Sequence, residues 1–404
     1  MCFDEKDGAL LWQLVVPKRI EDPYYDWPNT GLSSTATVQD DRVYILSNRG
    51  EVLCLDALGL SNGNQGSVQD EGRRFSGTNS IPMETGPLDA DILWSCDLVK
   101  EVGIWSHDAA NASILVHGDF LYVNTGTGVD NTHRRIRAPE APSLVVINKA
   151  TGRLVARDEE PISPNIFHCT WSSPCLARID GKDRIIFAAG NGIVFGFEPI
   201  QKEPNEGVAK LRKVWSYDFD PDAPKTEVHR YTSNRNEGPS NIYGMPVFQD
   251  GRLYIAGGGD LWWGKNAAWL KCIDPRGTGL ASTNAVLWSY PLNRHTLSTA
   301  AVDQGLAFVT DCGRTVHCVD AKTGEPLWSH ETKGEFWASP FVVDGKVFVG
   351  TRRGDFWVFA AQRQKKVLAE IDLGAPISAT VTAANGTLFV STAFNLYSIA
   401  SPTR

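Results

Sequence analysis

The stretch that decides the fold is Leu297–Ser329, LSTAAVDQGLAFVTDCGRTVHCVDAKTGEPLWS. It contains short apolar runs separated by polar turns, and each turn carries a glycine: Asp-Gln-Gly, Asp-Cys-Gly and Lys-Thr-Gly. Runs of this length between such turns are typical of antiparallel strands joined by tight connections. The stretch therefore predicts four strands, at Ser298–Val302, Gly305–Thr310, Thr315–Asp320 and Glu325–Ser329.

The same pattern recurs along the chain. The equivalent first-strand residues Ser298, Ala338 and Ser378 are each 40 residues apart, and earlier copies begin near Ser33, Ala112, Ser172 and Gly244. A repeat of four strands in about forty residues is typical of a β-propeller blade, which buries its faces only against neighbouring blades. We therefore predict an all-β fold, a single domain over residues 1–404 with seven blades, or eight as the alternative.

The two ends of the chain predict how the propeller closes. The last copy stops near Ile399 after three strands, and Asp7–Val16 has the sequence of a fourth. We expect this N-terminal strand to complete the last blade and remove its open edge. Cys2-Phe-Asp4 also resembles the end of a third strand, which is why eight blades remain the alternative.

Two residue types recur at fixed places in the repeat. Cys2, Cys54, Cys272 and Cys318 stand in Cys-Phe-Asp, Cys-Leu-Asp, Cys-Ile-Asp and Cys-Val-Asp, which predicts buried core positions rather than metal ligands. No Cys-x-x-Cys pattern is present. The fourth strands end in tryptophans that we expect to wedge between neighbouring blades: Trp12, Trp94, Trp215, Trp288 and Trp328.

Composition narrows the classes of partner. The 404 residues include 39 Lys and Arg against 47 Asp and Glu, a net charge of −8, so the chain has no general attraction for nucleic acid or anionic lipid. No apolar run is long enough to insert into a membrane. The first residues lack the basic and apolar regions of a signal peptide. The expected partners are a small polar ligand or another protein.

The Asp-x-x-Thr-Gly-x-x-x-Trp element at Asp320–Trp328, degraded at Asp4–Trp12, resembles the repeat of the PQQ-like, quinoprotein-type β-propellers. Longer stretches at Pro28–Leu32, Ala138–Leu144 and His168–Pro174 resemble exported PQQ-like repeat proteins of planctomycete-type bacteria. The BamB-type propeller and the PQQ-dependent dehydrogenases are similar more distantly. This resemblance implies a periplasmic or extracellular protein.

The resemblance also bears on cofactors and partners. PQQ-dependent dehydrogenases of this fold carry an adjacent Cys-Cys pair at the cofactor, and this chain has none, so PQQ is not expected. Their calcium ligands and catalytic Asp do not map onto matching positions either. The BamB-type propeller is a protein-interaction scaffold without long decorated loops.

Several long connections are predicted to open on one face of the propeller. They include loops at 125–142 and 219–243, whereas the insertion at 59–90 lies on the opposite face and is polar and Gly-rich enough to be mobile. Five of the eight histidines fall on or beside different loops of the first face: His107, His133, His168, His229 and His295. We expect at least three of them to converge.

These histidines are the candidate catalytic residues, either as ligands of a divalent metal or as acid–base groups. Arginines would neutralise an anion and aromatic rings would form the walls of a pocket. The candidate ligand-binding residues are Asp108, Arg135, Trp171, Arg230, Trp263, Arg314, Trp337 and Arg352.

Two functions follow from these residues. One is binding of a small polar or saccharide-like ligand, with metal-assisted or His/Arg acid–base catalysis if the site is that of a lyase, hydrolase or oxidoreductase. The alternative is a non-catalytic, BamB-like interaction scaffold. Sequence motifs for a nucleophile elbow, a P-loop, a dinucleotide fingerprint or a zincin helix are absent.

Overall fold

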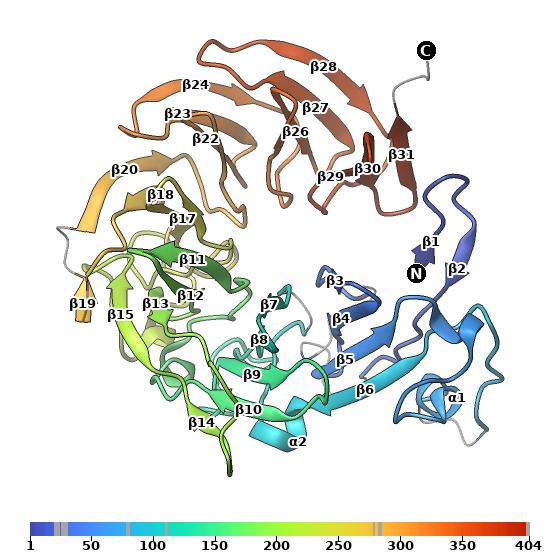
Figure 1. The fold of residues 1–404 in the computed structure, drawn as a ribbon. Helices are drawn as coiled ribbons and strands as arrows, with labels where there is room; N and C mark the ends of the chain where they lie inside the picture. The colour runs from blue at the N-terminus through green and yellow to red at the C-terminus, as the bar shows by residue number, and fades with distance from the viewer. Residues whose placement is uncertain are drawn as a thin grey trace. The chain divides into compact units, whose positions relative to one another are not determined.

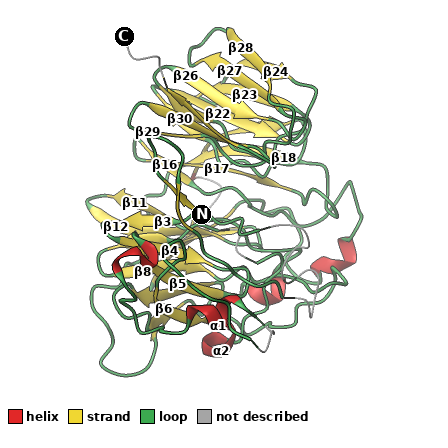
Figure 2. Cartoon of the chain, turned by 90° about the vertical axis from the view of Figure 1, so that its right-hand side faces the viewer, coloured by secondary structure: helices red, strands yellow, loops and turns green. Residues whose placement is uncertain are grey.

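A computed structural model describes residues 1–19, 25, 31–77, 81–109, 112–277, 279–281 and 285–400. The chain is a seven-bladed β-propeller of antiparallel sheets, as predicted, and its helices are short (Figures 1 and 2). It divides into two compact units. Unit 1 comprises residues 1–174 and 198–212, and unit 2 comprises residues 175–197 and 213–404. The expectation of a single domain stays a prediction.

Unit 1 contains two complete blades and an N-terminal hairpin. Blade 1 has the strand order β3-β4-β5-β6, and blade 2 has the order β7-β8-β9-β10 with β14 added in parallel to β10. The bounds in blade 1 are β3 Thr37–Gln39, β4 Arg42–Leu46, β5 Glu51–Asp56 and β6 Ile92–Asp97. Those in blade 2 are β7 Leu115–His117, β8 Phe120–Asn124, β9 Leu144–Asn148, β10 Leu154–Arg157 and β14 Ala209–Lys210.

Unit 2 contains the remaining five sheets. Blade 3 is β11 Cys175–Ile179, β12 Lys182–Ala188, β13 Ile193–Phe197 and β15 Lys213–Asp218, with β19 Gly279–Ala281 added in parallel. Blade 4 is β16 Val247–Gln249, β17 Arg252–Gly258, β18 Ala268–Ile273 and β20 Val286–Leu292. The parallel fifth strands of blades 2 and 3 were not predicted from the repeat.

The last three sheets follow the repeat most closely. Blade 5 is β21 Ala301–Asp303, β22 Leu306–Asp311, β23 Thr315–Asp320 and β24 Pro326–Glu331. Blade 6 is β25 Phe341–Val343, β26 Lys346–Gly350, β27 Asp355–Ala360 and β28 Val367–Asp372. Blade 7 contributes β29 Thr382–Ala384, β30 Thr387–Ser391 and β31 Leu396–Ala400.

The repeated cysteines occupy one structural position, as predicted. Cys54 is paired with Trp94 across β5 and β6, Cys272 with Trp288, and Cys318 with Trp328, and in each case the register shifts immediately afterwards. These three cysteines are buried and free. The bulge that follows each pair increases the local twist of the strand. The same bulge recurs in blades 1, 4 and 5.

The tryptophans form the predicted seams within each unit. The indole Nε1 of Trp94 donates a hydrogen bond to Lys149 O in the next blade, at 3.1 Å. In unit 2 the indoles of Trp288 and Trp328 donate to Ala321 O and Gln362 O, at 3.1 and 3.0 Å. Gly152 and Gly324 lie under the rings of Trp94 and Trp288, where a Cβ atom would come within 2.6 Å of the indole, so the seams leave no room for a side chain there.

The N-terminal hairpin repeats this arrangement. Strand β1, Cys2–Phe3, pairs with β2, Leu10–Trp12, and Cys2 lies opposite Trp12. Trp12 donates to Ala57 O of blade 1 at 2.8 Å, which is the contact a fourth-strand tryptophan makes with the following blade. The strand is shorter than the predicted Asp7–Val16. Completion of the last blade by the N-terminal strand stays a prediction.

The 59–90 insertion packs against blade 1 where the structure describes it. It contains a 3-10 turn, η1 Gly59–Asn62, and helix α1 Glu71–Phe75. Phe75 joins the core formed by Trp12, Leu53 and Leu55, and the buried Glu71 accepts hydrogen bonds from Asn64 Nδ2 and Ile92 N. Its mobility stays a prediction. Among the described residues, no helix has the length and hydropathy needed to cross a membrane.

Candidate metal centre in unit 1

Three of the predicted histidines meet at one end of blade 2. His107 lies on the connection that follows helix α2, Leu98–Val102, and leads to β7. His133 lies between β8 and β9, and His168 lies between β10 and β11. The imidazole centroids of His107 and His168 are 4.5 Å apart, and that of His133 is 5.0 and 5.4 Å from them. All three histidines lie on or beside loops that were predicted to open on one face of the propeller.

A backbone framework fixes two of these histidines. The segment 126–129 runs between segments 105–107 and 168–170, with bridges from Ser106 to Thr127 and from Gly128 to Cys169. Gly126 O accepts from His107 N at 3.0 Å, and His168 O accepts from Val129 N at 2.9 Å. The side chain of Asn124 supports the third segment by donating to the carbonyls of Thr170 and Ser172.

Gly128 is the residue that lets these segments approach. A Cβ atom there would lie 2.6 Å from both His107 Cβ and His168 O, closer than side-chain atoms pack. Its φ angle is not in the left-handed region, so space rather than backbone conformation demands glycine here. The sequence offered no signal for this, because the residues that crowd Gly128 come from distant parts of the chain.

The ring orientation of His107 is set by a carbonyl. His107 is 1 % exposed, and its Nδ1 lies 2.7 Å from Val129 O. A carbonyl oxygen only accepts, so Nδ1 carries the proton and Nε2 of the neutral ring carries a lone pair. That Nε2 lies 3.0 Å from Nε2 of the buried His168. A backbone carbonyl that holds the far nitrogen is the usual support of a metal-binding imidazole.

A tight turn places His133 beside the other two histidines. Asp130 O accepts from His133 N, and Asp130 N donates to Arg135 O, which closes the turn across Val129 and Ile136. His133 has a φ of 54°, a left-handed conformation that is uncommon for a residue with a side chain. Such strain is found where the surroundings fix a functional side chain.

The carboxylate of Asp130 stabilises this turn. Burial works to raise its pKa, but hydrogen bonds from Thr132 and the ion pair with Arg137, at 3.0 Å, outweigh burial and lower the pKa. Arg137 also lies over the Trp105 ring, with its guanidinium carbon 4.4 Å from the centroid. Arg137 and Asp130 therefore anchor the loop that carries His133. Neither residue was predicted from the sequence.

Asp108 and Trp171, two of the predicted ligand-binding residues, border the cluster. Asp108 Oδ2 lies 3.9 Å from His107 Nε2, and Asp108 is buried with a φ of 49°. Trp171 donates from Nε1 to His107 O at 3.1 Å, and its ring lies 5.8 Å from that of His168. Trp171 thus supports the backbone of His107. Their binding of a ligand stays a prediction.

The donor set fits a divalent transition metal. One nitrogen from each of His107, His133 and His168 lies within 4.8 Å of the other two. Two nitrogens bound to one zinc ion at about 2.0–2.1 Å are at most about 4 Å apart. A small movement of the half-buried His133 therefore suffices to bring all three onto one ion.

The other two predicted histidines belong to unit 2. His229 lies on the 3-10 turn η3, Val228–Tyr231, and is half-buried. His295 is buried, and its Nε2 lies 2.9 Å from Lys265 O. Burial lowers the pKa of His295 more than the hydrogen bond raises it, so the ring is held neutral. Each of these two histidines has local contacts in its own unit.

The predicted arginines have ordinary partners. Arg230 and Arg314 are exposed and form ion pairs with Glu227 and Glu331, at 2.6 and 3.3 Å. Arg135 is exposed and contributes its backbone carbonyl to the turn at Asp130. Arg352 is paired with Glu335 at 3.5 Å. Their prediction as ligand-binding residues is not tested by these contacts.

Aromatic residues form a second group in unit 2. The guanidinium carbon of Arg352 lies 3.8 Å from the Trp337 ring centroid, and Trp337 meets Trp262 edge to face at 6.1 Å. The half-buried Trp263 donates its backbone N–H to Asp260 Oδ1 at 2.6 Å. Asp260 thus holds the turn that carries Trp262 and Trp263.

Comparisons with known proteins agree with the repeat. Residues 266–368 match the family model described as outer membrane protein assembly factor BamB. A quinohemoprotein alcohol dehydrogenase, ADH-IIG of Pseudomonas putida, is 26 % identical over 209 residues, or 45 % of this chain. The aligned part is a quarter of the length of that dehydrogenase.

Solved structures are similar in fold. BamB from Moraxella catarrhalis superposes with a TM-score of 0.57 at 15 % identity, over 91 % of this chain and 84 % of that one. The C-terminal WD40 domain of Sif2 superposes with a TM-score of 0.51 at 10 % identity, over 92 and 81 % of the two chains. The protein is thus a β-propeller with a PQQ-like, BamB-type repeat.

Proposed function

We propose that the metal centre His107–His133–His168 binds a divalent transition metal and, through it, a small polar or saccharide-like ligand. The observation that carries this is the contact between His107 and His168, whose Nε2 atoms lie 3.0 Å apart while a carbonyl holds His107 Nδ1. Two neutral imidazoles satisfy such a contact when one carries its proton on the shared nitrogen and donates it to the other. A metal ion satisfies both lone pairs at once.

Three histidines leave a coordination position for a ligand. A zinc ion held by three protein ligands keeps a fourth position for water or substrate, lowers the pKa of that water and polarises carbonyl oxygens. The chain's own part is to orient the imidazoles through Val129 O and to hold His133 through the Asp130 turn. Asp108, 3.9 Å from His107 Nε2, is placed to accept a proton or to serve as a further ligand. PQQ has no part in this proposal.

A metal titration tests the proposal. Purified full-length protein stripped with a chelator should take up one equivalent of Zn²⁺ or Co²⁺, and Co²⁺ should give the visible absorption of a histidine-ligated ion. His168→Ala should weaken the affinity more than a hundredfold. His117→Ala, which changes a half-buried histidine on β7 of the same unit, is the matched control and should leave the affinity unchanged. No stoichiometric uptake, or equal losses in both variants, would contradict the proposal.

An interaction scaffold is the second candidate function. Residues 266–368, which match the BamB model, lie in unit 2, whereas the three histidines lie in unit 1. A scaffold of this kind would act in the periplasm or outside the cell, and its protein partner would bind equally well to wild type and His168→Ala. Measuring partner capture with both proteins therefore separates this function from metal-dependent binding.

A further inference from the structure

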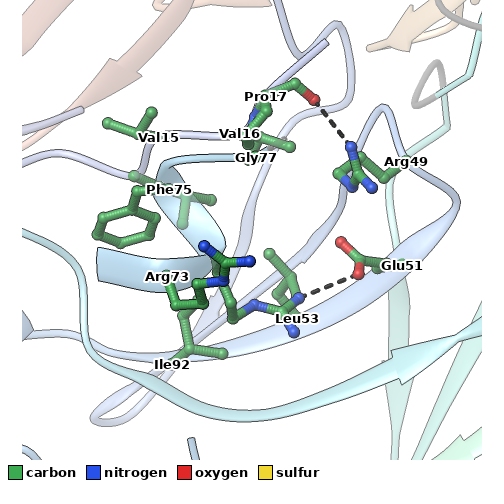
Figure 3. Close-up of a pocket in the computed structure, with 12 residues that line it drawn as sticks. Val15, Val16, Pro17, Arg49, Glu51, Leu53, Arg73, Phe75, Gly77 and Ile92 are labelled. Atoms are coloured by element: carbon green, nitrogen blue, oxygen red, sulfur yellow. Dashed lines mark hydrogen bonds and ion pairs between the residues drawn. The ribbon is translucent and has the colours of Figure 1, made fainter. Parts of the chain in front are cut away.

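A pocket of unit 1 lies against blade 1, and the residues that line it are distant in sequence from the three histidines. Figure 3 shows Arg49 and Glu51 along one side of it and Arg73 with Phe75 along the other. The residues come from the segment Leu14–Pro17 after β2, from the β4–β5 turn with strands β5 and β6, and from helix α1 of the insertion with the turn after it. The insertion thus builds a wall of this pocket.

The charge of the pocket opposes the charge of the chain. Three guanidinium groups, from Arg49, Arg73 and Arg74, line it together with one carboxylate, Glu51. Its local balance is therefore +2, from three positive charges and one negative, in a chain of net charge −8. A concentration of one sign in a hollow with low-dielectric walls attracts ions of the opposite sign.

Arg49 and Arg74 retain N–H groups that can donate hydrogen bonds to a ligand. Arg74 is partly buried and pairs with Glu51 Oε1 at 3.0 Å, and its other terminal nitrogen lies 3.5 Å from Ser95 Oγ. Arg49 donates to Pro17 O at 3.4 Å. A guanidinium has five N–H donors, so these bonds use only part of the capacity of either side chain. Paired arginine donors match the oxygens of carboxylate and phosphate groups.

The rest of the lining is apolar. Leu53, Phe75 and Ile92 belong to the core of blade 1, and Val15 and Val16 line the pocket with them (Figure 3). A pocket with a cationic side and an apolar lining suits a ligand that has an oxyanion at one end and a short apolar body. We infer that this pocket binds a small organic anion, a carboxylate or phosphate carried on an apolar group.

Tyr25 connects this pocket with the loop of the metal centre. Its hydroxyl lies 3.4 Å from Arg49 O, its own carbonyl accepts from Ala109 N, and its ring meets Trp105 edge to face at 5.4 Å. The anion pocket and the His107 loop therefore share one buried support. The inference itself does not depend on a metal at the histidines.

Calorimetric titration with phenyl phosphate and inorganic phosphate tests the inference, in chelator-treated full-length protein. Phenyl phosphate should bind, and more tightly than inorganic phosphate because of the apolar lining. Arg73→Gln should weaken binding about tenfold, the usual effect of losing a charge-assisted hydrogen bond. Glu51→Gln keeps the acceptor for Arg74 and removes the negative charge, so it should strengthen binding about threefold to tenfold.

Two controls make the result decisive. Arg178→Gln removes an exposed arginine of unit 2 and should leave binding unchanged. His168→Ala should also leave it unchanged, which separates this pocket from the metal centre. Equal weakening by Arg73→Gln and Arg178→Gln, weaker binding after Glu51→Gln, or loss of binding in His168→Ala would each overturn the inference, as would the absence of binding to wild type.

Discussion

Two buried histidines with the same exposure show opposite surroundings. His317, on β23 of unit 2, is 1 % exposed and lies between Asp311 Oδ2 at 2.8 Å and the Tyr290 hydroxyl at 3.0 Å. His107, in unit 1, is also 1 % exposed, but its second nitrogen faces another imidazole. Asp311 and Tyr290 complete the hydrogen bonding of His317, whereas the group that faces Nε2 of His107 is the imidazole of His168.

The difference separates a structural histidine from a candidate ligand. A carboxylate and a hydroxyl satisfy both ring nitrogens of His317 in one protonation state, so nothing further is needed there. The proposed function places a metal ion between the nitrogens of His107, His133 and His168. Burial of a histidine alone is therefore a poor guide to its function. The chemical nature of the groups that face its ring nitrogens distinguishes a structural histidine from a candidate metal ligand.

Substitution of His317 should have the largest effect on stability. His317→Ala leaves the carboxylate of Asp311, which is fully buried, without its imidazole partner. We expect a loss of about 3–5 kcal/mol in the free energy of unfolding, measured by urea denaturation, with metal affinity unchanged. The double variant Asp311→Asn/His317→Ala should recover part of this loss. A reduced metal affinity in His317→Ala would contradict the distinction between the structural His317 and the candidate metal ligands of unit 1.

Gly128→Ala should have an intermediate effect on both properties. The added methyl group collides with His107 Cβ and His168 O, so the two segments must separate. We expect a loss of about 1–3 kcal/mol in the free energy of unfolding, the usual cost of overpacking, together with weaker zinc binding in a chelator competition. Gly86→Ala, at an open position of the same unit, is the control. Unchanged zinc affinity in Gly128→Ala would mean that the spacing of the two histidines is not critical.

A smaller effect is expected from pH at His330, a half-buried histidine of β24. Burial lowers the pKa of His330, and its Nε2 has no hydrogen-bond partner among the described residues. The unfolded chain therefore takes up a proton more readily, so this contribution to stability is present above about pH 6.5 and is lost as the pH falls through the folded-state pKa. His330→Phe should lose less stability than wild type between pH 7.5 and 5.5 in urea denaturation. Equal losses would show that His330 does not titrate differently on unfolding.

The blades were predictable because each depends on neighbours within the same repeat. Asp320–Trp328 contains its own turn signals, and the spacing of Ser298, Ala338 and Ser378 carries the period of the fold. The grouping of His107, His133 and His168 followed from which connections share a face. Their supports did not follow, because the fit of Gly128 and the bond from His107 to Val129 O depend on backbone positions that no local pattern encodes.

The arginine pocket could not be predicted from the sequence either. Arg73 and Arg74 lie in an insertion that interrupts the repeat, and Arg49 lies in an ordinary turn of blade 1. Nothing in their spacing relates them. The packing of Phe75 into the core of blade 1 helps to bring the insertion to that turn.

The tryptophan seams have a consequence for the order of folding. The indoles of four seam tryptophans donate to carbonyls only 33 to 55 residues further along the chain, from Trp288 to Ala321 at one extreme and from Trp94 to Lys149 at the other. Contacts this close in sequence form quickly, since the loops they close are short. During synthesis a blade can therefore dock on the preceding blade of its own unit soon after it leaves the ribosome, which shortens the time for which an incomplete blade edge is exposed.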